Sequence, residues 1–81
     1  MDAHLVTTDS PTRAIRARLC DLDCAIVLAE VGASAAAECA AESTLLGLPD
    51  SALWHARNWT ARKDLTTELR MQSRELTRAI A

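Results

Sequence analysis

Residues 15–40, which read IRARLCDLDCAIVLAEVGASAAAECA, decide the fold of this chain. Apolar or small side chains recur in this stretch with alternating spacings of four and three residues. Such spacing places them along one side of an α-helix, as in the contact seam of a coiled coil. The seam residues are Ile15, Leu19, Leu22, Ile26, Ala29, Ala33, Ala36 and Ala40. The pattern predicts one long helix.

This helix is expected to run from about residue 11 to 46. Ser10-Pro11 is a good helix start, because serine supplies a capping oxygen and proline suits the first helical position. The seam passes through Gly32, and glycine inside a helix costs about 1 kcal/mol. Two predictions stay open: a helix continuous through Gly32, or a break there that gives a three-helix bundle.

Gly47-Leu48-Pro49-Asp50 predicts the turn that ends this helix. Glycine often follows a helix end, and Asp50 or Ser51 can cap the next helix. A second helix is expected over about residues 51–79. Its expected apolar face consists of Leu53, Trp54, Ala61, Leu65, Leu69, Leu76 and Ile80.

The charges are divided in a way that favours an antiparallel hairpin. Residues 19–50 hold six acidic residues and no base, and residues 51–81 hold six bases and three acids. Folding the chain about the turn pairs residues whose numbers add up to about 98 to 100, so Leu22 faces Leu76. The expected ion pairs in this register are Asp21–Arg78, Glu30–Arg70, Glu38–Arg62 and Glu42–Arg57. The predicted fold class is all-α, an antiparallel hairpin of two long helices.

The domain organisation follows from the same patterns. Residues 1–9 are polar and aperiodic and are expected to form a flexible N-terminal tail, so residues 10–81 form a single hairpin domain. A chain of 81 residues buries little surface when it folds alone. We therefore expect dimerisation to complete a four-helix bundle.

The composition argues against a sheet protein, a secreted protein and a membrane protein. Two glycines, two prolines and the absence of Tyr and Phe argue against a sheet protein. The amino-terminal residues lack the basic and apolar regions of a signal peptide. The longest unbroken apolar run, 24–29, is far shorter than the roughly 20 residues of a membrane span. Three cysteines without a secretion signal are expected to stay reduced. These features predict a cytoplasmic protein without a membrane segment.

The first helix has more apolar surface than one neighbouring helix can cover. Cys20, Cys24, Val27 and Val31 form a stripe beside the seam, and Trp59 cannot share a helix face with Trp54 because the two are five residues apart. The stripe and Trp59 are the expected interface with a partner protein or a second copy. The leading hypothesis is a small, non-enzymatic protein–protein interaction module: a regulator, inhibitor or adaptor.

Two other functions are weighed against this one. The hairpin register brings Arg13, Arg16 and Arg18 near Arg74 and Arg78, and clustered arginines suit an anionic partner such as nucleic acid. The net charge of −2 argues against this function.

The second alternative is a metal or thiol redox protein that uses Cys20 and Cys24, which lie one helical turn apart. We expect these thiols instead to be buried as small apolar groups. No catalytic triad, phosphate-binding loop or metalloprotease motif occurs, so no catalytic residue, cofactor or metal ligand is assigned.

Overall fold

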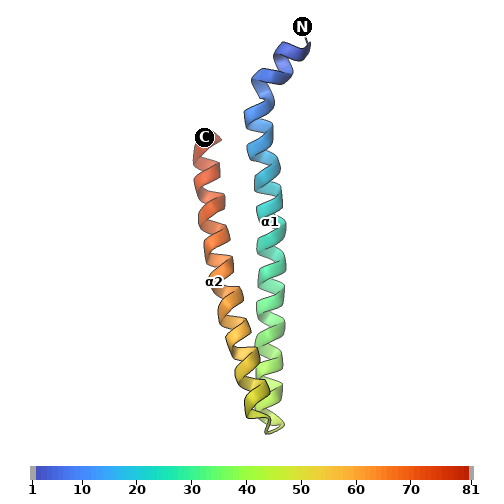
Figure 1. The fold of residues 1–81 in the computed structure, drawn as a ribbon, viewed down its shortest axis with the longest axis vertical. Coiled ribbons are helices and arrows are strands. Elements are labelled where there is room, and N and C mark those ends of the chain that lie inside the picture. Colours follow the sequence, from blue (N-terminus) through green and yellow to red (C-terminus); the bar gives the residue numbers. More distant parts are fainter. Residues whose placement is uncertain (1, 81) are drawn as a thin grey trace.

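The computed structural model describes the backbone of residues 2–80 and the side chains of residues 11–80. Helix α1 runs over Asp2–Leu45 and helix α2 over Pro49–Ile80. The two helices lie side by side in opposite directions, and α1 continues past the carboxyl end of α2 (Figure 1). The structure thus confirms the all-α hairpin of two long helices.

Helix α1 begins earlier than the sequence predicts. The expected start at Pro11 is wrong, because Pro11 lies inside a helix that begins at Asp2. Proline inside a helix removes one hydrogen bond and bends the axis without always ending the helix. The first turns of α1, in blue, lean away from the rest of the helix (Figure 1). The side chains of the expected tail, residues 1–9, lie outside the described ones, and its flexibility stays a prediction.

Helix α1 passes through Gly32 without a break, so the three-helix alternative is wrong. The Arg62 side chain of α2 crosses the helix at this point. A Cβ atom on residue 32 would lie 2.8 Å from Arg62 Cζ and 3.1 Å from its Cδ. Glycine is compatible with the helix here, and its missing side chain leaves room for the guanidinium group.

The turn is a helix C-cap of the Schellman type. The Leu48 amide donates to the Ser43 carbonyl at 2.9 Å, and the Gly47 amide donates to the Thr44 carbonyl at 3.1 Å. Gly47 has a φ of 72°, which L-residues rarely adopt. Helix α2 then starts at Pro49, ahead of the predicted start near residue 51. The fixed φ of proline suits the first helical position, which explains the difference.

The seam predicted for α1 is confirmed. All eight of its expected residues are buried or half-buried, and Ser43 continues the seam toward the turn. Leu22, Ala29, Ala33 and Ala36 are the buried apolar residues among those described, and Leu22 alone is large. The core is therefore a thin line of mostly small side chains.

The face predicted for α2 is correct only in its second half. Leu69, Leu76 and Ile80 are half-buried, as expected, but Leu53, Trp54, Ala61 and Leu65 are exposed. The residues that replace them in the seam are mostly polar: His55, Asn58, Arg62 and Thr66. Small side chains on α1 let α2 lie close, and a short side chain such as that of Thr66 fits a close seam. The Thr66 hydroxyl donates to the Arg62 carbonyl at 2.9 Å, so its burial leaves no unpaired donor.

One of the four predicted interhelical ion pairs forms among the described side chains. Arg70 donates to Glu30 near the middle of the hairpin, as the predicted antiparallel register requires. Asp21, Glu38 and Glu42 make no such contact within residues 11–80. Arg62, the expected partner of Glu38, lies over Gly32 instead.

The hairpin is a long rod with much open surface. Its principal extents are 68 × 19 × 14 Å, and its Cα radius of gyration is 19.0 Å. A compact chain of this length has a radius of gyration of about 12 Å. The accessible surface is 6188 Å², against roughly 4,800 Å² for a typical folded protein of this mass. About 1,400 Å² of surface is therefore in excess of what a folded chain of this size normally exposes.

Candidate protein-interaction surfaces

The seam divides the remaining surface into two flanks. In coiled-coil notation, the seam of α1 uses Leu22, Ala29 and Ala36 at d and Ala33 at a, and the residues on either side of the seam are e and g. On α2, Leu69 occupies d and Thr66 occupies a. Glu30 and Arg70 therefore both occupy e positions, and their contact shows that the e positions of the two helices share one flank. The g positions therefore share the opposite flank.

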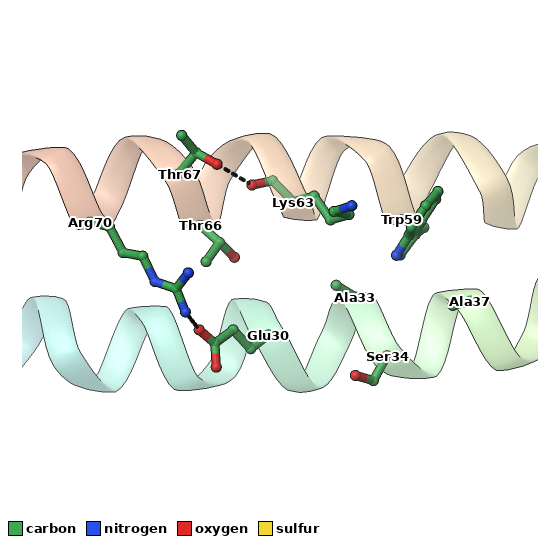
Figure 2. A pocket seen from close by; sticks show the side chains of 9 residues that line it. All are labelled: Glu30, Ala33, Ser34, Ala37, Trp59, Lys63, Thr66, Thr67 and Arg70. Carbon is green, nitrogen blue, oxygen red and sulfur yellow. Dashed lines mark hydrogen bonds and ion pairs between the residues drawn. The ribbon is translucent and has the colours of Figure 1, made fainter.

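The flank with the ion pair, here called the ion-pair flank, is hollowed by a groove of about 470 Å³ (Figure 2). In Figure 2, the Arg70 side chain reaches Glu30 across the groove, and Trp59 extends from α2 toward α1 near Ala37. The Lys63 ammonium group lies 4.5 Å from the centre of the Trp59 ring. A cation over an aromatic face stabilises the ring by about 0.5–1 kcal/mol at an exposed site.

Toward the turn, the same flank has a second and more apolar groove. It has a volume of about 570 Å³ and is lined by the ends of both helices, including Ala41, Thr44, Leu48, Leu53 and Ala56. This groove was not predicted, because the sequence pattern places Leu53 in the seam. Leu48, an apolar residue within the turn, is the signal that could have revealed it.

The predicted stripe on α1 is open to solvent. Val27 and Val31 are 58% and 62% exposed, and Leu28 beside them is 70% exposed. Cys20 and Cys24 are exposed free thiols, as is Cys39, so the prediction that the cysteines are buried is wrong. They lie on the outer side of a helix whose single neighbour covers only the seam. Trp59 is 38% exposed and lies at the edge of the seam on the ion-pair flank.

The sequence also predicted two alternative sites, an arginine cluster and a pair of cysteines. The five arginines proposed for an anionic partner, Arg13, Arg16, Arg18, Arg74 and Arg78, are all exposed. Within residues 2–80, no group of three or more His, Cys, Asp or Glu residues is arranged to hold a metal ion. Both alternative functions stay predictions.

By length and composition alone, one segment of α1, Pro11–Leu45, is apolar enough to cross a membrane. Its most apolar 18-residue window has a mean hydropathy of 1.6, and 17% of that window is buried in the hairpin. The core helix of a soluble protein meets the same criterion. The expectation drawn from unbroken apolar runs missed this property because Glu30 and Glu38 interrupt the stretch.

Comparison of the chain with models of protein families, with curated proteins and with solved structures found no match. The functional proposal therefore relies on the surfaces of the hairpin.

Proposed function

We propose that the protein is a small non-enzymatic protein–protein interaction module that acts through apolar helix faces. The observation that carries this proposal is the exposure of the stripe at Val27 and Val31, with Leu28 beside it, on a rod with about 1,400 Å² of excess surface. A stable protein–protein interface takes about 800 Å² from each partner. The excess surface is therefore enough area for one or two such interfaces.

A second copy is the first occupant that we propose, on the ion-pair flank. On this flank α1 carries the acids Asp23 and Glu30, and α2 carries the bases Lys63, Arg70 and Arg74. Rotating a second hairpin by 180° about the long axis places its basic α2 against the acidic α1 of the first. Opposite charges then meet at both contacts, which favours this arrangement over pairing of like helices. The product is an antiparallel four-helix bundle, with Val27 and Trp59 at the new contacts.

The cytoplasm is the compartment that we propose for this module. Its exposed thiols at Cys20, Cys24 and Cys39 persist in the reduced state in a reducing compartment and would crosslink copies in an oxidising one.

Sedimentation equilibrium of matched variants tests the proposed assembly. Val27→Asp places a charge on the stripe, whereas Met71→Asp makes the same kind of change on an exposed apolar side chain of α2. We expect Val27→Asp to weaken dimerisation at least tenfold, about 1.4 kcal/mol, with the helical circular dichroism retained. Met71→Asp should change dimerisation less than threefold. Equal effects of the two variants would contradict the proposed interface.

Affinity capture from the native host tests whether a different protein also binds. The wild-type chain and Met71→Asp should capture the same proteins, and Val27→Asp should lose those that bind on the Val27 side of the hairpin. A parallel flotation assay with phosphatidylcholine vesicles measures whether the apolar helix α1 binds to a lipid bilayer. Recovery of the chain with the vesicles, or a strict monomer that captures no protein, would overturn the proposal.

A further inference from the structure

The flank opposite the ion pair carries exposed apolar side chains from both helices. Leu65 and Trp54 of α2 are 46% and 64% exposed on this side, and they are the residues that the sequence pattern assigned to the core. Helix α1 contributes Leu28 and the smaller Ala35 and Cys39, which are also exposed. An apolar surface that spans two helices is what a third helix needs in order to pack between them.

The charges around this surface have one sign. The g positions from residue 25 to 79 carry no charge. The next positions outward, c in the heptad, carry four acids and no base from residue 21 to 75. These acids are Asp21 and Glu42 on α1 and Glu68 and Glu75 on α2, all exposed. We name this surface the acid-rimmed flank, because each helix contributes two carboxylates to its edge.

One base reaches this flank from the seam. The guanidinium group of Arg62 lies over Gly32, which occupies a g position, and the Nε atom of Arg62 is buried with no hydrogen-bond partner among residues 11–80. A second base, Arg18, occupies the g position next to Asp21 and is exposed. The four carboxylates outnumber these two cations. A partner residue facing Gly32 is therefore best a hydrogen-bond acceptor, because the rest of the guanidinium group is a strong donor.

A second copy of this chain does not suit the acid-rimmed flank. Pairing two such flanks would place four acids against four acids, and like charges across an interface disfavour association. The ion-pair flank has acids on one helix and bases on the other, so it is self-complementary, and the acid-rimmed flank is not. The two flanks of the rod therefore call for different occupants.

We propose that the acid-rimmed flank binds a basic amphipathic helix of another protein, which completes a three-helix arrangement on that side. This inference rests on the proposed function as an interaction module and specifies the chemistry of its partner. The apolar face of the partner covers Leu28 and Leu65, and its Lys or Arg residues lie along both acidic rims. The flank spans residues 25–46 of α1, about 32 Å, so a helix of about 20 residues covers it.

Fluorescence anisotropy with the full-length chain and synthetic peptides tests this inference. The probe is a labelled 21-residue peptide of Leu and Lys with leucines at helical spacing. One control peptide has Glu in place of Lys, and a second has the same composition as the probe in scrambled order. We expect the probe to bind at least tenfold more tightly than either control. Equal binding of the scrambled peptide would show only general attraction of opposite charges and would overturn the inference.

Matched variants locate the binding surface. Glu68→Lys reverses a rim charge, and Asp64→Lys makes the same change on the same helix at an exposed position away from the rim. We expect Glu68→Lys to weaken binding of the probe about fivefold or more and Asp64→Lys to change it less than twofold. The probe should also slow alkylation of Cys39 but not of Cys24. Equal effects of the two substitutions, or no protection of Cys39, would overturn the inference.

The outcomes for the two proposals are distinguishable. A chain that dimerises through Val27 and ignores the probe would refute the basic partner and leave the interaction module standing. A chain that stays monomeric and binds the probe as described would refute the dimer and leave the acid-rimmed flank as the binding surface.

Discussion

Among residues 11–80, Leu22 is the one large side chain that the seam buries completely, with 1% of its surface exposed. The other buried apolar residues are alanines, which bury far less surface when the chain folds. Much of the apolar stabilisation is therefore concentrated at one position on α1.

Leu22→Ala should destabilise the hairpin by about 2–5 kcal/mol, since truncation of a buried leucine loses apolar burial and leaves a cavity. A small domain has a free energy of unfolding of only about 5–15 kcal/mol. The substitution therefore removes a large fraction of the stability of the hairpin. Leu45→Ala is the matched control, because Leu45 is fully helical but 88% exposed. Urea denaturation followed by circular dichroism measures both. Equal losses would show that Leu22 is not in the core.

Gly32→Ala tests the contact between Gly32 and Arg62. Alanine has the better helix propensity by about 1 kcal/mol, and the atoms that its Cβ would meet belong to the flexible Arg62 side chain. We expect Arg62 to turn outward and the free energy of unfolding to rise by up to about 1 kcal/mol. Thermal unfolding of Gly32→Ala with and without Arg62→Ala measures this. A loss of stability that the second substitution reverses would show that Arg62 is held in place.

The turn between the helices depends on a single backbone conformation. Gly47→Ala should cost about 1–2 kcal/mol, because an L side chain at a positive φ meets its own carbonyl group. Gly47→Asn should cost less, since asparagine tolerates this region. Urea denaturation of the two variants compares them. An alanine variant as stable as the wild type would mean that the turn adopts another conformation.

The Glu30–Arg70 pair joins the helices near the middle of the hairpin. Both side chains are about half exposed, so their coupling should amount to only about 0–1 kcal/mol and should fall as salt is added. A double-mutant cycle with alanine at both positions measures it. The same cycle at Glu38 and Arg62, which form no ion pair, should give a coupling near zero. A larger coupling for Glu38 and Arg62 would indicate a different register.

The sequence predicts α1 better than α2 for a physical reason. Helix α1 keeps apolar or small residues at every seam position, so its spacing identifies the buried face. Helix α2 has leucines on two faces, and which face is buried depends on the small seam residues of α1 between residues 29 and 43. The buried face of α2 therefore cannot be read from the sequence of α2 alone. The position of Pro11 inside a helix could not be predicted from the sequence either, because proline can begin a helix or lie within one.

One of the candidate surfaces could be predicted from the sequence, and another could not. The exposed stripe at Val27 and Val31 could be predicted, because α1 is apolar on more sides than one neighbour covers. The acid-rimmed flank could not be predicted. This surface forms only when Leu65 lies outside the seam and Glu68 and Asp21 lie at the edges of the flank. Residues from both helices define it, and their relative rotation is known only from the structure.

The whole molecule is a rod with two unlike flanks, and its extended shape is the basis for every surface proposed above. A chain of this size that folded into a compact bundle would cover the stripe and both flanks with its own residues. Small-angle X-ray scattering of the purified protein tests the shape most directly. The maximum dimension should be near 68 Å, with or without a second copy alongside. A compact particle with a radius of gyration of about 12 Å would contradict the hairpin.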